Sequence, residues 1–186
     1  KNVELDWNGY KINYSQAGAL GYGVNISGYD NITVKNCNIV EGNSATSQKH
    51  AVSIYDSSNI ELLNNSITVA GSSYGVKMEM VNFSLITASN FFREGGVNNG
   101  LIYLTEESLW NNITDSFFNA TTNPGISADS GPSYILISNV SINSTSGNGF
   151  TLGEGMENWT IQDSTIVTTG VNAEGMALGS DSAGYN

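Results

Sequence analysis

A repeat of about 25 residues runs through nearly the whole chain and limits the fold more than any other feature. A small residue followed by an apolar one returns at steps of 28, 24, 25, 25, 24 and 26 residues. Periods of roughly 20 to 50 residues are typical of solenoids and other repeat proteins. The pairs are Gly23-Val24, Ala51-Val52, Gly75-Val76, Gly100-Leu101, Gly125-Ile126, Gly149-Phe150 and Gly175-Met176.

A second apolar set recurs with nearly the same steps and supports the repeat independently. Its members are two residues apart, which is the period of a β-strand, and many are β-branched. No stretch shows the sustained spacing of an amphipathic helix. The leading positions are Ile32, Ile60, Leu85, Asn111, Ile135 and Trp159; two residues later come Val34, Leu62, Thr87, Ile113, Ile137 and Ile161, and seven after the lead come Ile39, Ile67, Phe92, Phe118, Ile142 and Ile166.

These patterns predict an all-β fold, a right-handed parallel β-helix of about seven coils in which each strand pairs with its equivalent in the next coil. The right hand follows from the chirality preference of parallel connections. A chain of 186 residues is within the usual size of one domain. We predict a single domain over residues 1–186, with an irregular first coil at 1–22, six full coils at 23–174 and an incomplete last coil at 175–186.

The composition argues against several classes of partner. Seventeen acidic and six basic residues give a net charge of −11, which would repel nucleic acid and anionic membrane surfaces. No apolar run approaches the roughly 18 residues of a membrane-spanning helix. No signal peptide opens the chain, so in an exported protein it would already be removed. The single cysteine, Cys37, is predicted to be a buried, inert thiol.

Polar residues also recur in each repeat, and they predict two columns. An Asn or Asp beside the second strand would form a hydrogen-bonded ladder of Asn36, Asn64, Asp115, Asn139 and Asp163, with Asn65 and Asn90 inward. Acidic residues after the small residue would stack roughly 5 Å apart, and Ca²⁺ between coils would relieve their repulsion. Alternatively these positions drift and each carboxylate is solvated. The candidate calcium ligands are Asp56, Glu79, Glu106, Asp129 and Glu154.

Ten Asn-x-Ser/Thr sequons indicate an exported, N-glycosylated protein, located outside the cell or at its surface. Several sequons arise from the repeat itself, so we expect only a minority to be modified. The turn residues Asn31, Asn82 and Asn158 are the leading candidates, followed by Asn13, Asn25, Asn64, Asn112, Asn119, Asn139 and Asn143.

One histidine and a group of aromatic residues are the remaining candidates for a site. His50 ends a long loop and has no second candidate ligand nearby in the sequence, which is typical of a structural residue. Of each Phe-Phe pair one ring should point inward and the other outward. Outward rings would form a sugar-binding platform, a partner contact or ordinary surface packing. The aromatic residues of coils three and four are Phe83, Phe91, Phe92, Tyr103, Trp110, Phe117 and Phe118.

The opening of the chain resembles a known family. The stretch Val-Glu-Leu-Asp-Trp-Asn-Gly-Tyr-Lys-Ile-Asn at residues 3–13 is followed by Gly-Tyr-Gly-Val-Asn-Ile-Ser-Gly-Tyr-Asp-Asn-Ile-Thr-Val-Lys-Asn-Cys-Asn-Ile at residues 21–39. Both look like the start of right-handed parallel β-helix domains of the pectate-lyase-like superfamily. The similarity is greatest to the branch with NosD-type carbohydrate-binding and sugar-hydrolase repeats, which is common in archaeal and bacterial surface proteins. It covers essentially the whole chain but specifies fold better than activity.

The same resemblance implies which residues an enzyme of this superfamily would need. Pectate lyases need clustered calcium-binding carboxylates with a catalytic arginine or lysine, and polygalacturonases need paired aspartates with Gly-His-Gly and Arg-Ile-Lys motifs. Neither polygalacturonase motif is present, and the single arginine, Arg93, is followed by Glu94 rather than by an aspartate cluster. We therefore expect no catalytic residues and no required cofactor.

Three functions remain open at this stage. The first is a non-enzymatic structural subunit of a cell-surface filament, sheath or surface layer that self-associates end to end. The second is a glycan-binding or adhesion module of a larger surface protein, with an extracellular polysaccharide as partner. The third, a polysaccharide lyase or hydrolase, is least favoured. The predicted assembly contacts lie in the first and last coils, at Val3, Leu5, Trp7, Met176 and Leu178.

Overall fold

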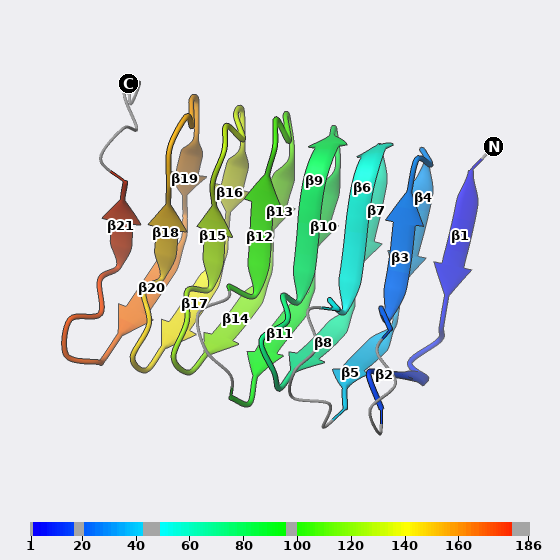
Figure 1. The fold of residues 1–186 in the computed structure, drawn as a ribbon, viewed down its shortest axis with the longest axis horizontal. Coiled ribbons are helices and arrows are strands. Elements are labelled where there is room, and N and C mark those ends of the chain that lie inside the picture. Colours follow the sequence, from blue (N-terminus) through cyan, green and yellow to red (C-terminus); the bar gives the residue numbers. More distant parts are fainter. Residues whose placement is uncertain (1, 17–20, 43–48, 96–99, 180–186) are drawn as a thin grey trace.

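The computed structural model describes residues 2–16, 21–42, 49–95 and 100–179, and these residues form three parallel β-sheets without any helix (Figure 1). Each coil contributes one strand to sheet A, one to sheet B and one to sheet C. Every strand pairs in parallel with the equivalent strand of the next coil. The predicted all-β solenoid is therefore confirmed.

The strands of each sheet follow one another along the solenoid from β1 to β21 (Figure 1). Sheet A contains β1 (Val3–Asp6), β4 (Ile32–Lys35), β7 (Ile60–Leu63), β10 (Leu85–Thr87), β13 (Asn112–Thr114), β16 (Leu136–Ser138) and β19 (Thr160–Gln162). Sheet B contains β2 (Lys11–Tyr14), β5 (Asn38–Glu41), β8 (Ser66–Val69), β11 (Asn90–Arg93), β14 (Phe117–Ala120), β17 (Ser141–Ser144) and β20 (Thr165–Thr168). Sheet C contains β3 (Val24–Ser27), β6 (Val52–Ser58), β9 (Val76–Asn82), β12 (Ile102–Thr105), β15 (Ile126–Ala128), β18 (Phe150–Leu152) and β21 (Met176–Leu178).

The first coil is more regular than the sequence predicts. Strands β1 and β2 lie within the segment expected to be irregular, yet they pair in register with β4 and β5. Only residues 17–20 of that segment lie outside the described structure, together with residue 1. The structure therefore extends the repeat to the first described strand.

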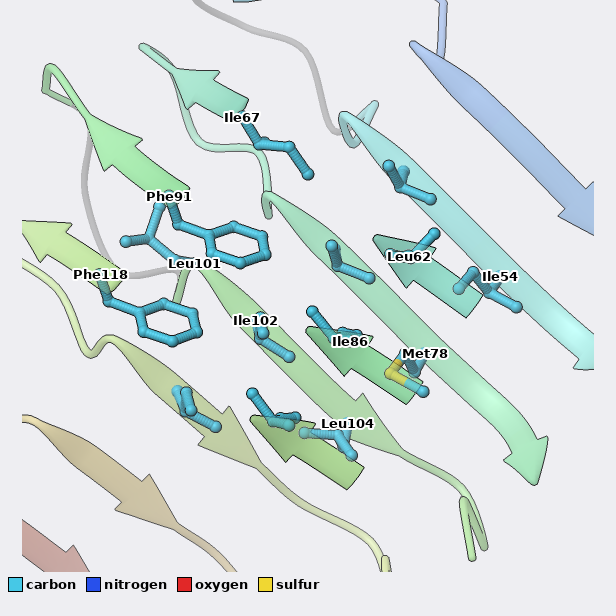
Figure 2. Packing of buried hydrophobic residues seen from close by; sticks show 14 of the residues in the cluster. Ile54, Leu62, Ile67, Met78, Ile86, Phe91, Leu101, Ile102, Leu104 and Phe118 are labelled. Carbon is cyan, nitrogen blue, oxygen red and sulfur yellow. The ribbon is translucent and has the colours of Figure 1, made fainter. Parts of the chain in front are cut away.

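Apolar side chains from the three sheets meet in one column inside the solenoid (Figure 2). Phe91 and Phe118 are fully buried, and their rings stack with centroids 4.7 Å apart. Phe92 and Phe117 point outward and are only half-buried, as the alternation of a strand requires. Each large apolar side chain that is fully buried stabilises the fold by roughly 1.5 to 3 kcal/mol relative to exposure.

The repeat alignment predicted from the sequence is wrong by one residue in two coils. The strand register aligns Ile86 with Leu62 and Ile113, and aligns Phe91 with Ile67 and Phe118. In coil four Ile102, and not Leu101, aligns with Val76 and Ile126. A slip of one residue moves every side chain of a strand to the other face. The positions expected at Leu85, Thr87, Asn90, Phe92 and Leu101 therefore belong to Ser84, Ile86, Ser89, Phe91 and Ile102.

Each coil after the first turns from sheet A to sheet B through one residue with a left-handed backbone, with φ between 49° and 53°. Asn and Asp tolerate this conformation better than most residues, which explains their recurrence here. The Nδ2 of Asn64 donates to Asn36 Oδ1 at 2.7 Å, and the Nδ2 of Asn139 donates to Asp115 Oδ1 at 2.7 Å. The predicted ladder is confirmed for these pairs. The corner residues are Asn36, Asn64, Ala88, Asp115, Asn139 and Asp163.

Buried polar side chains satisfy backbone groups next to the same corner. The Oδ1 of Asn65 accepts a hydrogen bond from Cys37 N at 3.0 Å, and its Nδ2 donates to Val34 O at 2.9 Å. An unpaired buried backbone group would destabilise the fold, so these amides are structural. Cys37 is buried as predicted, and burial raises the pKa of its thiol, which keeps it protonated. Asn90, which was expected to point inward, is exposed, and Ser89 is buried in its place.

Candidate functional site

The outer face of sheet C has two hollows lined by polar side chains. One hollow of about 290 Å³ lies over β3, β6 and β9, and the other of about 600 Å³ lies over β12, β15 and β18. The parallel register places one outward residue of each coil in a single column along this face. That column is Asn25, Ser53, Lys77, Tyr103, Ser127, Thr151 and Ala177.

A row of aromatic rings runs beside these hollows. Tyr22, His50 and Tyr74 each stand two residues before a sheet C strand, so successive coils place them side by side. The centroids are 6.0 Å apart from Tyr22 to His50, 5.1 Å from His50 to Tyr74 and 4.6 Å from Tyr74 to Tyr103. Tyr74 and Tyr103 stack nearly parallel, with planes 10° apart, so their facing surfaces cover each other, and both residues line the larger hollow.

Charged groups of both signs lie along the same face. Lys77 and Glu79 form a short ion pair, and the Lys49 ammonium stands 4.4 Å from the centre of the Tyr22 ring. Burial raises the pKa of Tyr74 to about 12, so its phenol stays protonated near neutral pH and remains a hydrogen-bond donor. At the other end, the carboxylate of Asp129 accepts from Ser130 N at 2.8 Å. The face therefore presents cationic, anionic and neutral hydrogen-bonding groups at different points.

His50 is buried between the two hollow-lining tyrosines Tyr22 and Tyr74, and 8% of it is exposed. Its Nδ1 accepts a hydrogen bond from Tyr74 N at 3.3 Å. Burial lowers the pKa of His50 from 6.5 to about 4, with Lys77 and Lys49 also disfavouring the charged ring. The imidazole is therefore neutral at pH 7. The sequence predicts a structural histidine at the end of a long loop but does not predict its burial between two tyrosines.

Acidification should destabilise the fold through His50. The folded-state pKa lies below the unfolded value, so the contribution is complete above pH 6.5 and is lost as the pH falls toward 4. Between pH 7.5 and pH 5 the free energy of unfolding should fall by about 2 kcal/mol from this residue alone. Urea unfolding of the wild type and of His50→Gln at both pH values measures this change in the free energy of unfolding. Equal pH dependence in the two proteins would contradict the assignment.

The described structure does not bring the five predicted calcium ligands into one column. In the register of sheet C, Glu79 lies between Tyr55 and Thr105. In the coil between Asp56 and Glu106, the residue at the corresponding position is Met80, which is not acidic. Within residues 2–16, 21–42, 49–95 and 100–179, no group of three or more His, Cys, Asp or Glu side chains could hold a metal ion. The number of residues between a sheet C strand and the next sheet A strand differs between coils. The acidic residues therefore do not keep the same position from coil to coil.

The ten sequon asparagines differ in whether the side chain is hydrogen-bonded and whether the residue is exposed. Asn64 and Asn139 use their Nδ2 groups in the corner ladder, and the Oδ1 of Asn82 accepts from Leu109 N at 2.9 Å. Asn119 is half-buried. The exposed sequon residues without these bonds are Asn13, Asn25, Asn31, Asn112, Asn143 and Asn158.

Three large aromatic side chains are exposed at the corner between sheets C and A. Phe83 is 61% exposed, Trp110 49% and Tyr134 41%. The rings of Trp110 and Tyr134 stack with centroids 3.9 Å apart and planes 10° apart. The two facing ring surfaces cover each other, and sugar binding by this row stays a prediction.

The terminal strands of the described structure expose apolar side chains. Val3 and Trp7 in or beside β1 are 53% and 40% exposed, and Met176 and Leu178 in β21 are 39% and 52% exposed. Leu5 is partly buried against the core. Strands β1 and β21 each pair with one neighbour only among the described strands.

A buried ionic cluster at the end of sheet B was not found from the sequence. The guanidinium of Arg93 donates to the carbonyls of Gly71, Ser73 and Gly100 at 2.8, 2.7 and 3.2 Å. Glu41 accepts from the opposite side of the same loop, from Ala70 N and Gly71 N at 2.9 Å and from Ser73 Oγ at 2.6 Å. The loop at residues 70–73 is thus held between a carboxylate and a guanidinium. The one available signal was that Arg93 is the chain's single arginine.

A search of the described residues finds no membrane-spanning helix.

Comparison with known families assigns the fold. The family model described as "Right handed beta helix region" matches residues 2–178, which is nearly the whole chain. No curated protein shows a significant match to the sequence. The three parallel sheets agree with this family and with the pectate-lyase-like superfamily. The chain therefore belongs to the right-handed parallel β-helix family, which includes both enzymes and proteins without catalytic activity.

Proposed function

We propose that the protein binds an extended polysaccharide along the outer face of sheet C. The observation that supports this proposal is the row of Tyr22, His50, Tyr74 and Tyr103 beside two hollows aligned on one sheet. Ligand sites typically combine apolar or aromatic surface with a few polar groups that fix orientation. Here the rings supply the aromatic surface. The column of amide, hydroxyl and ammonium groups supplies the polar contacts.

The repeat of the solenoid suits a polymeric ligand. Successive coils are about 4.8 Å apart, which is comparable with the length of one sugar residue. A polysaccharide lying along the axis would meet an equivalent outward position on each coil, such as Ser53, Lys77 and Tyr103. Many weak contacts of this kind add up without requiring a deep pocket. The acidic charge and the exposed sequons support a location outside the cell, as part of the same proposal.

Truncation of one ring should weaken binding measurably. For Tyr103→Ala we expect about tenfold weaker binding of the best ligand in a panel of neutral, uronate-containing and amino-sugar polysaccharides, because ring contacts contribute on the order of 1 kcal/mol. Isothermal titration calorimetry measures the affinity. The matched control is Tyr10→Ala, since Tyr10 is 72% exposed and lies away from sheet C. The proposal fails if no polysaccharide binds, or if both variants bind like the wild type.

A second candidate function is end-to-end assembly into a filament or surface layer. It is favoured by the exposed apolar side chains of β1 and β21, which in a solenoid are normally covered by a neighbouring coil. A second copy placed end to end would cover them, and such a contact does not close on itself. Sedimentation velocity should then show species larger than a monomer that disappear in Leu178→Glu. Monomers at all concentrations would count against assembly.

A further inference from the structure

The corner between sheets C and A places an asparagine sequon directly after the exposed aromatic rings. In all six coils from residue 31 to residue 158, one residue here has a left-handed backbone, with φ between 52° and 59°. Three of these residues are asparagines, which tolerate the conformation. The other three are aromatic, and bulky residues are rarely found at positive φ. Along the column they are Asn31, Asn59, Phe83, Trp110, Tyr134 and Asn158.

Asn158 follows Tyr134 in the corner column, on the opposite side from Trp110. Trp110 covers the other face of Tyr134, with the centroids 3.9 Å apart and the planes 10° apart. The backbone N of Tyr134 donates to Glu157 O at 3.0 Å, which fixes Asn158 in the adjacent coil at the same corner. Tyr134 remains 41% exposed, so part of its side chain is accessible to a group attached in the adjacent coil.

The Asn158 sequon is itself accessible. Asn158 and Thr160 are both exposed, and within the described residues the Asn158 carboxamide makes no hydrogen bond. The intervening Trp159 donates from Nε1 to Pro132 O at 2.8 Å, which holds the sequon against the preceding coil. Attachment of a sugar to Asn158 Nδ2 would therefore break no contact of the fold.

Two other exposed sequons have no aromatic residue at the aligned position of the next coil. Asn143, for example, lies in β17 between Asn119 and Val167 of the neighbouring coils. Asn31 stands at the same corner as Asn158, but its neighbour in the next coil is Asn59. Of Asn31 and Asn158, the two exposed sequon residues in this corner column, Asn158 is the one that follows an aromatic residue.

We propose that Asn158 is N-glycosylated and that the first sugar packs its C–H face on the free face of Tyr134. An oligosaccharyltransferase would supply the sugar from a lipid-linked phosphate or diphosphate donor. The bond from Asn158 Nδ2 to the sugar C1 forms as the C1–O bond to the donor phosphate breaks, and Nδ2 loses one proton to a base of the transferase. The lipid phosphate leaves with the electron pair. This site involves none of the residues of the sheet C face, so it stands independently of polysaccharide binding.

The test is a comparison of occupancy and stability in protein secreted from a host that N-glycosylates. Glycopeptide mass spectrometry should find Asn158 occupied. Asn158→Gln should then lower the melting temperature by about 2 to 4 °C when Tyr134 is present. The same change made in Tyr134→Asn should have no effect, and that background should fold because three other coils have asparagine at this corner.

A matched control separates this contact from a general effect of glycans. Asn143→Gln removes an exposed sequon with no ring beside it, so any change it causes should be the same with Tyr134 or Asn at position 134. The proposal is overturned if Asn158 is unmodified in the secreted wild-type protein. It is also overturned if Asn158→Gln shifts the melting temperature equally in both backgrounds.

Discussion

Replacing Arg93 with alanine should lower the free energy of unfolding by about 3 to 5 kcal/mol. Arg93 is 3% exposed and its guanidinium bonds the carbonyls of Gly71, Ser73 and Gly100. The substitution leaves these acceptors without their donor and leaves the carboxylate of Glu41 buried without the nearby positive charge. Removal of one partner from a buried charged network is destabilising because the remaining groups stay buried.

Denaturant unfolding measures this loss, and a surface ion pair provides the control. Lys35 lies 3.0 Å from Glu4 and 3.5 Å from Asp6, but the Glu4 side chain is 56% exposed. Exposed pairs contribute little, so Lys35→Ala should change the free energy of unfolding by less than about 1 kcal/mol. A loss for Arg93→Ala as small as that for Lys35→Ala would show that the cluster does not hold the loop.

The second large effect concerns the glycine that recurs before the strands of sheet C. A Cβ on Gly149 would lie within 2.5 Å of Gly175 O and even closer to Ile166 Cγ2. Contacts this short force the neighbouring coil to move, so Gly149→Ala should destabilise the fold by about 2 to 3 kcal/mol. This close approach between coils explains why a glycine recurs at the position.

The same column contains its own control for this prediction. A Cβ on Gly175 would have Ile166 Cγ2 as its nearest atom, at 4.0 Å, which is an ordinary contact. Gly175→Ala should therefore leave the melting temperature unchanged or raise it slightly, since alanine restricts the unfolded chain. Thermal unfolding followed by circular dichroism compares the two variants. Equal losses would mean that the coil spacing does not explain the glycines.

The repeat architecture could be predicted because its signals are spread along the whole chain. A glycine or alanine before the sheet C strand, an asparagine or aspartate at the left-handed corner and apolar residues two apart recur in most coils, with Leu101 and Ala88 as exceptions. These signals are local and agree with one another, so the class of fold follows even when a single coil is ambiguous. The inward position of Cys37 and the corner ladder between Asn36 and Asn64 followed in the same way.

Where two apolar residues are adjacent, the sequence does not decide which of them points into the core. Leu85-Ile86 and Phe91-Phe92 each offer two candidates for one inward position, and Leu101-Ile102 offers two candidates for the first strand position, both of which are buried. Strand pairing with the neighbouring coils decides between them, and that information is not local. The sequence pattern alone therefore predicts the wrong inward residues in coil three and shifts the alignment of coil four by one residue.

The candidate site depended on alignment between coils to within one residue. Tyr22, His50 and Tyr74 form a row because each stands two residues before its strand, although the loops that precede them differ in length. The contacts of Arg93 with a loop about 20 residues away are likewise tertiary. For the same reason the acidic residues, which recur at only approximately equal spacing, did not predict where their carboxylates lie.

A crystal structure of the protein with an oligosaccharide from the polysaccharide that binds best would test the central proposal most directly. The account predicts that the sugar chain lies along the outer face of sheet C, with Tyr74, Lys77 and Tyr103 in contact with it. A sugar chain bound instead to sheet A, to sheet B or to the Phe83–Trp110–Tyr134 corner would contradict the proposed site.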